Sequence, residues 1–210
     1  MLPTPSLDTL LQSADNALRA LFAPAHASRT PPGLPAATPL AEADRRLVAG
    51  LMRVNHAGEI AAQALYHGQA LMARSPETRE FLLRAAAEEG DHLAWCEQRL
   101  QELGDRTSLL NPLWYAGSFL IGAATAAVSD KVSLGFVTET ERQVEGHLAS
   151  HLARLPAADE RSRRIIETMQ ADEVGHANAA LAAGATELPR PARELMKLTS
   201  KIMTQSAFRF

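Results

Sequence analysis

Proline divides this chain of 210 residues into an irregular beginning and a body of long helices. Seven of the twelve prolines lie in the first 40 residues, and the other five stand where a helical pattern begins or ends. Because proline removes a backbone donor and breaks a helix interior, we expect the stretch from Pro24 to Pro39 to be irregular. The sequence therefore divides into residues 1–40, a short amphipathic helix followed by a proline-rich arm, and residues 41–210.

Apolar residues recur at helical spacing in each proline-free interval of the body. The pattern predicts helices at residues 41–73, 77–103, 112–129, 131–155, 158–183 and 190–206. We find no alternating strand pattern and no Asn-Gly or Asp-Gly hairpin turn, and aromatic residues make up only 5% of the chain. The predicted fold class is all-α, and a bundle is the usual way to bury so many amphipathic helices.

Charge and composition exclude several classes of protein. Lys and Arg number 21 and Asp and Glu 24, a net charge of −3 that gives no electrostatic basis for binding nucleic acid. A single cysteine forms no intrachain disulfide and favours a reducing compartment. Asp8, Asp15 and Arg19 interrupt the apolar stretch that a secretory signal needs. Within the uncharged run 107–129, the apolar residues 113–128 would make a helix of about 24 Å, shorter than a hydrocarbon core of about 30 Å, which suits a buried or interfacial helix.

Acidic residues stand where core residues are expected. Glu59 carries the only formal charge in residues 54–73. Two later helices each place a Glu-x-x-His pair, Glu89 with His92 and Glu173 with His176, on an apolar stripe. The stripes are Leu82, Ala85, Glu89, His92, Cys96 and Leu103, and Ile166, Met169, Glu173, His176 and Ala180. Because a buried carboxylate is costly unless it is compensated, a metal or another cation is the expected partner, with a solvated surface position for Glu59 as the alternative.

The two halves of the chain repeat this arrangement. Glu59 precedes Glu89 by 30 residues, and Glu141 precedes Glu173 by 32. Four carboxylates and two imidazoles on four helices are the ligands of a dinuclear iron or manganese site in a helical bundle. Glu141 is chosen over its neighbours because its offset from Glu59 matches the offset between the pairs, although this segment could also be a charged outer face.

Four further residues have open roles. His56 could support the metal site or lie on a helix surface, and His147 and His151 could be outer partners of the site but fit a solvated face better. Cys96 continues the stripe one turn past His92, and we interpret it as a small buried hydrophobic residue that is not a ligand.

Four motifs and the C-terminal sequence resemble those of the bacterial demethoxyubiquinone hydroxylases. The motifs are RVNHAGE at residues 53–59, EEGDH at 88–92, ETE at 139–141 and DEVGH at 172–176, and the closing sequence is TSKIMTQSAFRF. The resemblance covers roughly residues 41–210. It implies a ferritin-like four-helix bundle with additional interfacial and C-terminal helices.

The resemblance also implies an activity, an O2-dependent monooxygenase of ubiquinone biosynthesis that hydroxylates 2-polyprenyl-3-methyl-6-methoxy-1,4-benzoquinol. Two iron ions would be held by six residues, with Glu89 and Glu173 as the bridges; the six are Glu59, Glu89, His92, Glu141, Glu173 and His176. The enzyme would lie peripherally on the cytoplasmic face of the bacterial cell membrane. A homo-oligomer or a biosynthetic complex stays open.

Two sequence features fit a lipid substrate. The 107–129 helix has Trp114 and Tyr115 near its start, where aromatic residues suit a membrane interface. Residues 190–210 carry a net charge of +4, which an anionic membrane surface attracts. A central bundle helix and a solvated terminal helix are the alternatives. For the whole chain, the competing functions are a ferritin-like iron oxidase or store, a dimanganese catalase and a metal-free helical interaction module.

Overall fold

A computed structural model of the chain describes residues 5–33 and 39–210. Over these residues it contains seven α-helices and no strand, which confirms the all-α prediction. The helices are α1 (Leu7–Phe22), α2 (Glu42–Met72), α3 (Pro76–Glu102), α4 (Asn111–Val128), α5 (Asp130–Arg154), α6 (Glu160–Ala182) and α7 (Arg190–Ala207). Each boundary of the six predicted helices is found within two residues.

Capping residues explain where the helices begin. The side chains of Ser75, Ser129 and Asp159 accept hydrogen bonds from backbone N–H groups in the first turns of α3, α5 and α6. Pro76 and Pro112 occupy the first turns of α3 and α4, where a missing N–H costs nothing. These prolines therefore mark helix starts, as the sequence predicted.

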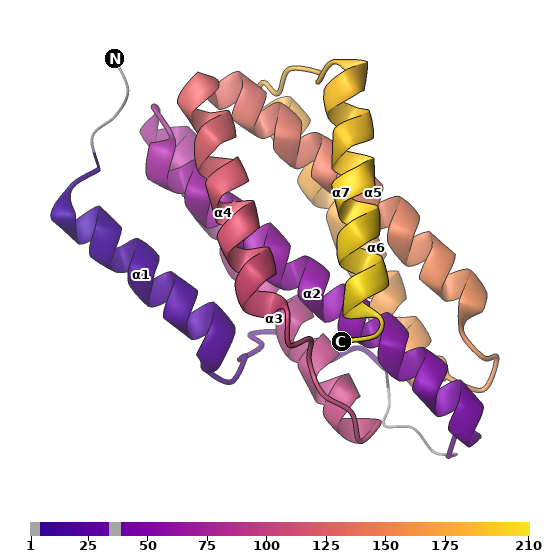
Figure 1. Cartoon of the computed structure of the whole chain (residues 1–210). Helices are drawn as coiled ribbons and strands as arrows, with labels where there is room; N and C mark the ends of the chain where they lie inside the picture. Colours follow the sequence, from indigo (N-terminus) through magenta and orange to yellow (C-terminus); the bar gives the residue numbers. More distant parts are fainter. Residues whose placement is uncertain (1–4, 34–38) are drawn as a thin grey trace.

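Four helices form the core of the molecule. α2 packs against α3, and α5 packs against α6, so that two antiparallel pairs face each other. α4 joins the two pairs and lies along α2, whereas α7 returns to contact α2 and α5. Figure 1 shows α4 and α7 on the near side of the bundle, α3 and α6 behind, and α1 at one flank.

The contact between α2 and α4 depends on two glycines. A Cβ atom at Gly68 would overlap the backbone oxygen of Phe119, and one at Gly122 would overlap the backbone oxygen of Leu65. The two helices therefore approach backbone to backbone. This contact holds the uncharged α4 helix on the bundle without burying all of its apolar side chains.

Apolar side chains fill the bundle on both sides of its middle. One cluster includes Met52, Trp95 and Ile166, and the other includes Tyr66 and Leu82. In each core helix, the polar residues singled out in the sequence lie between the residues of these two clusters. The candidate site is therefore enclosed in the centre of the bundle, with a cluster of apolar side chains on either side of it along the bundle axis.

The structure tests two expectations about the membrane: whether a helix is long enough to span it, and where the aromatic residues of α4 lie. Over residues 5–33 and 39–210, no helix combines the length and the apolar character needed to cross a bilayer. The expectation that Tyr115 lies at an interface is wrong, because its ring is buried and its hydroxyl lies 3.1 Å from Nδ1 of His67. Trp114 is half-buried against Val54 and Ala57.

Candidate metal centre

The six candidate residues converge in the middle of the core. Glu59 comes from α2, Glu89 and His92 from α3, Glu141 from α5, and Glu173 and His176 from α6. The first five are at most 3% exposed, and His176 is partly buried. The solvated alternatives for Glu59 and Glu141 are therefore wrong.

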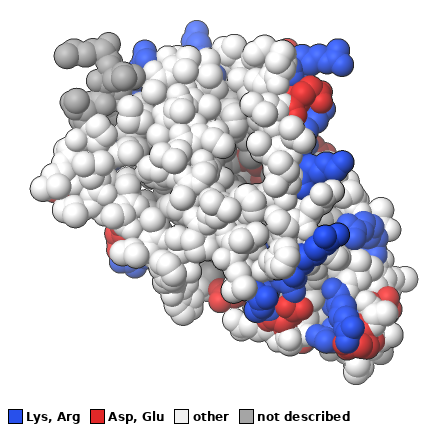
Figure 2. Space-filling model, in the orientation of Figure 1, with Lys and Arg blue, Asp and Glu red and all other residues white. Residues whose placement is uncertain are grey.

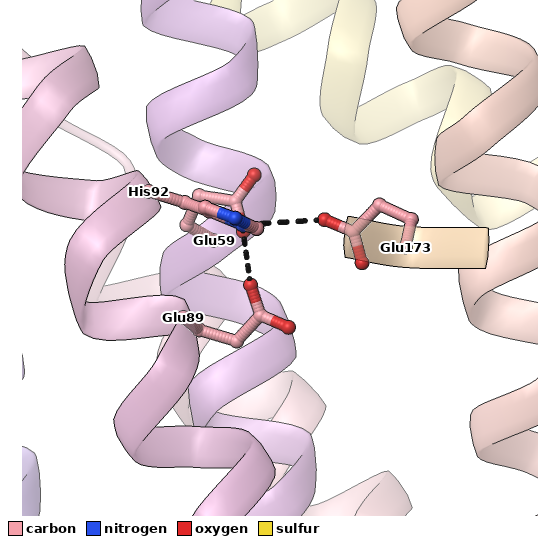
Figure 3. A group of neighbouring side chains, drawn as sticks. All are labelled: Glu59, Glu89, His92 and Glu173. Atoms are coloured by element: carbon pink, nitrogen blue, oxygen red, sulfur yellow. Dashed lines mark hydrogen bonds and ion pairs between the residues drawn. The ribbon is translucent and has the colours of Figure 1, made fainter. Parts of the chain in front are cut away.

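Ligand atoms of these residues fall into two overlapping groups. Glu59, Glu89, His92 and Glu173 form one group, and Glu89, Glu141, Glu173 and His176 form the other, each within 4.8 Å. Figure 3 shows the first group, with Glu173 reaching from α6 toward His92 and Glu89 on α3. Glu89 and Glu173 belong to both groups, which is the placement that two bridging carboxylates would need.

The distances repeat the twofold pattern of the sequence. Nδ1 of His92 lies 2.9 Å from Oε2 of Glu89 and 3.4 Å from Oε1 of Glu173. Nδ1 of His176 lies 3.0 Å from Oε1 of Glu89 and 3.4 Å from Oε2 of Glu173. Each imidazole thus directs Nδ1 at the same two carboxylates, from opposite sides.

Burial and mutual repulsion set the protonation of the outer carboxylates. The pKa of Glu59 and the pKa of Glu141 are raised well above their ordinary values, first because both groups are buried and then because Glu173 and other carboxylates lie close. Burial also acts to raise the pKa of Glu89, but the two imidazoles outweigh it and hold that pKa below its usual range. Without a cation, the cluster must therefore keep protons to limit its negative charge.

Several buried ligand atoms lack a hydrogen-bond partner within the described part of the chain. They are Oε1 of Glu89, Oε1 of Glu141, both carboxylate oxygens of Glu173 and Nδ1 of His176. The 3.0 Å contact between His176 and Glu89 does not have hydrogen-bond geometry. Because an unsatisfied buried polar group costs about 1–3 kcal/mol, so many converging on one space fit a bound cation. The oxygen and imidazole donors suit iron or manganese.

Each imidazole is also held from its outer side by an acidic residue of the opposite helix. Nε2 of His92 lies 2.9 Å from Oδ2 of Asp172, and Nε2 of His176 lies 2.9 Å from Oε2 of Glu88. These acids directly precede Glu173 and Glu89 in the sequence, so the repeat extends one residue further than the Glu-x-x-His motif. This one-residue extension of the repeat is the sequence signal that points to both Glu88 and Asp172.

The remaining histidines lie outside the two groups. His151 is buried, and its Nδ1–H donates to Oδ1 of Asn55 at 2.8 Å, so the preferred solvated face is wrong for this residue. His56 is also buried, 3.4 Å from the amide nitrogen of Asn111. Burial lowers the pKa of His56 to about 4 and that of His151 to about 3. Cys96 is buried, as predicted, with its sulfur 3.8 Å from that of Met169.

Comparison with known proteins identifies the family of the chain. The family described as ubiquinone biosynthesis protein COQ7 matches residues 46–207. A protein of Variovorax paradoxus is 56% identical over 98% of this chain and 99% of its own length, and one of Bordetella avium is 56% identical over 97% and 94%. A Ralstonia pickettii protein is 54% identical over 97% and 99%, and all three are named 3-demethoxyubiquinol 3-hydroxylase. The chain therefore belongs to the COQ7 family, whose fold is the ferritin-like helical bundle seen here.

Proposed function

We propose that this chain is a 3-demethoxyubiquinol 3-hydroxylase that uses O2 and a pair of iron ions held by the six residues of the central cluster. The observation that carries the proposal is the twofold set of four buried carboxylates and two imidazoles in a chain whose relatives bear that name. The product would gain one hydroxyl group on the benzoquinol ring. This is a late step of ubiquinone biosynthesis.

Charge balance supports two divalent ions. Four ionised carboxylates carry four negative charges, and a buried cluster of that charge is unstable unless cations compensate it. Two ferrous ions neutralise it fully with both imidazoles uncharged, which is the form in which histidine binds metal. When bound, the irons would supply the redox chemistry that activates dioxygen. The protein would hold the carboxylates apart, orient the imidazoles and keep water out.

An apolar cavity offers a route for the ring substrate. The cavity measures about 370 Å³ and lies between α2, α4, α5 and α7, with Leu113, Ile121 and Phe136 among its lining residues. A smaller cavity of about 30 Å³ reaches Glu59 itself. Gly58, Gln143, Val144, Ser200 and Met203 line both cavities. A substrate that enters between α4 and α7 would therefore approach the metal cluster past α2.

The same helices fit a membrane surface. α1, α4 and α7 expose large apolar side chains, among them Leu7, Leu11, Phe22, Leu113, Leu120, Leu195 and Ile202. Figure 2 shows a broad uncharged face over α1 and α4, and Lys and Arg side chains along the edge where α7 lies over α5. We propose peripheral binding on the cytoplasmic face of the cell membrane, with the polyprenyl chain entering from the bilayer. Leu113 and Leu120 replace the half-buried Trp114 as the expected anchors.

The apolar cavity also favours hydroxylation over its rivals. A ferritin-like iron store or a dimanganese catalase would share the ligands, but neither needs an apolar approach to Glu59. A metal-free interaction module gives no reason to bury four carboxylates beside one another, which is costly unless a cation compensates them.

The test is anaerobic reconstitution with ferrous iron, followed by isotopically heavy dioxygen and a short-chain demethoxyubiquinol. Mass spectrometry should find a hydroxylated product that carries one labelled oxygen atom. Glu59→Ala, which removes a ligand from one half of the site, is the control and should give no product. Iron-loaded wild-type protein that forms no product, or product whose oxygen comes from water, would contradict the proposal.

A further inference from the structure

The described part of the proline-rich arm, residues 24–33, lies over the outer side of the metal centre, where Arg29 binds Asp91 and Asp172. The backbone nitrogen of Ala25 donates to Oε2 of Glu97 on α3 at 3.1 Å. At the other end, Nη1 of Arg161 on α6 donates to the backbone oxygens of Pro32 and Gly33 at 2.8 and 2.9 Å. Residues 25–33 of the arm are therefore held at both ends by the two helices that carry the Glu-x-x-His pairs.

Arg29, in the middle of the arm, joins these two helices. Its Nε donates to Oδ2 of Asp91 on α3 at 2.7 Å, and its Nη2 donates to Oδ2 of Asp172 on α6 at 2.8 Å. The guanidinium also lies 4.7 Å from the ring centre of Trp95, whose indole N–H donates to the backbone oxygen of Arg29. Ser28 adds a hydrogen bond from its hydroxyl to Asp91. The forked guanidinium lets one side chain donate to both carboxylates in fixed directions.

Asp172 connects Arg29 to a metal-ligand candidate. Its Oδ2 lies 2.9 Å from Nε2 of His92. Because an ionised carboxylate can only accept hydrogen bonds, Nε2 must carry a proton, which leaves Nδ1, the nitrogen that faces Glu89, Glu173 and Glu59, as the one that would bind a metal ion. The 3.5 Å approach of Arg29 Nη2 to Nε2 follows from the sharing of one Asp172 oxygen by two donors.

In the described residues, the other half of the centre has no such clamp, meaning an Arg or Lys side chain that binds the acid behind the imidazole. Glu88 holds His176 in the same way, yet its side chain is 59% exposed. Within the described residues, no Lys or Arg pairs with Glu88. Arg84 lines the same surface hollow as Arg29 but pairs with Glu80. The arm thus distinguishes two metal positions that the core helices make nearly equivalent.

We infer that Arg29 is a positioning residue, which fixes Asp172 and through it His92, so that the arm retains the metal ion on the His92 side of the centre. This role rests on the proposed metal centre and lies in a segment outside the 46–207 match to the family. Removal of the clamp should loosen one metal position and leave the other unchanged. The effect should also pass entirely through Asp172.

Iron release tests this directly. Full-length protein is loaded anaerobically with ferrous iron, and release into an excess of a ferrous chelator is followed by absorbance. In Arg29→Gln, half of the iron should leave about 10-fold faster than from the wild type, since partners that orient a ligand contribute about 10–100-fold to metal affinity. The other half should leave at the wild-type rate. Arg84→Gln removes the same charge from the same hollow and should release iron as the wild type does.

The Asp172→Ala background separates positioning from general loosening. If Arg29 acts only through Asp172, Arg29→Gln adds no further acceleration there. Equal acceleration of both halves, or an added effect in that background, overturns the inference. If Arg29→Gln loads normally and releases its iron at the wild-type rate, the inference about Arg29 is wrong and the proposed function stands. If the wild-type protein binds no iron, both are wrong.

Discussion

At the scale of single residues, burial decides the chemistry of the core. Glu59 and Glu141 are buried beside other carboxylates and hold raised pKa values, so a bound metal must displace their protons. Burial has the opposite effect on the pKa of His151, because an imidazole is uncharged when it loses its proton, and burial favours the uncharged form. Its pKa falls to about 3, with burial the largest cause, followed by the positive charge that His147 and Arg154 can carry nearby.

His151 should make the protein sensitive to acid. Its pKa in the folded state lies below the unfolded value of 6.5, so its contribution to stability is present above about pH 6.5 and is lost as the pH falls toward about 3. Each unit of difference is worth about 1.4 kcal/mol. In urea titrations of the metal-free protein, His151→Gln should therefore flatten the loss of unfolding free energy over that range. Equal slopes for wild type and variant would contradict this account.

The residues that sequence reasoning found are those that interrupt an apolar stripe. Glu89 and His92 stood out because they occupy core positions of a helix, and Glu141 followed from the repeat. Arg29 could not be assigned in this way, because its contact with Asp172 joins residues 143 positions apart. His151 was misjudged because its partner Asn55 lies 96 residues away and gives no local signal.

At the scale of elements, the backbones of α4 and α2 come into direct contact, because no side chain separates the two helices at their closest points. Gly68 and Gly122 allow the two backbones to meet, and Thr125 bonds back to the backbone oxygen of Gly122. Helix bounds were predictable because prolines and capping residues are local signals. The packing partner of α4 was not, since its apolar pattern fits a buried, a central or an interfacial helix equally well.

A methyl group at Gly122 should separate these helices. Gly122→Ala places a Cβ atom onto the backbone of α2, which cannot move aside, so we expect a loss of unfolding free energy of about 1–3 kcal/mol or more. Gly117→Ala lies in the same helix with open space around its Cβ, and should be neutral or gain about 0.5–1 kcal/mol. Chemical denaturation of both variants tests the contact; a neutral Gly122→Ala would disprove it.

At the scale of the whole molecule, the proposed membrane face and the metal centre belong to one arrangement. The larger cavity lies between α2, α4, α5 and α7 and shares lining residues with the small cavity that reaches Glu59. α4 and α7 both expose apolar side chains, and α7 also carries basic ones. The arm covers the opposite side of the centre, where Asp172 and Glu88 support the imidazoles. A substrate that entered through the larger cavity would therefore approach the cluster from the side opposite Arg29 and Asp172.

Membrane binding should depend on both kinds of side chain on that face. Liposome flotation of the wild type should strengthen with anionic lipid and weaken with salt, because surface attraction is screened over about 8 Å at physiological ionic strength. Lys197→Glu with Lys201→Glu should weaken binding by at least about 1 kcal/mol per residue. Leu113→Ser with Leu120→Ser should weaken it even at high salt.

The matched control for the charge reversals is Arg164→Glu on α6, which lies on the far side of the bundle in Figure 1. This variant should float as the wild type does. A wild-type protein that stays wholly in the soluble fraction with anionic liposomes at low salt would exclude the proposed surface.

The central claim is that six residues of the bundle core hold two iron ions, and anaerobic ferrous titration with a count of bound iron per chain tests it most directly. We predict two ions per chain in the wild type. Glu173→Ala removes an oxygen donor shared by both ligand groups and should abolish tight binding of the pair, while circular dichroism shows nearly unchanged helix content. A wild type that binds one ion or none, or a Glu173→Ala variant that still binds two tightly, would contradict the account.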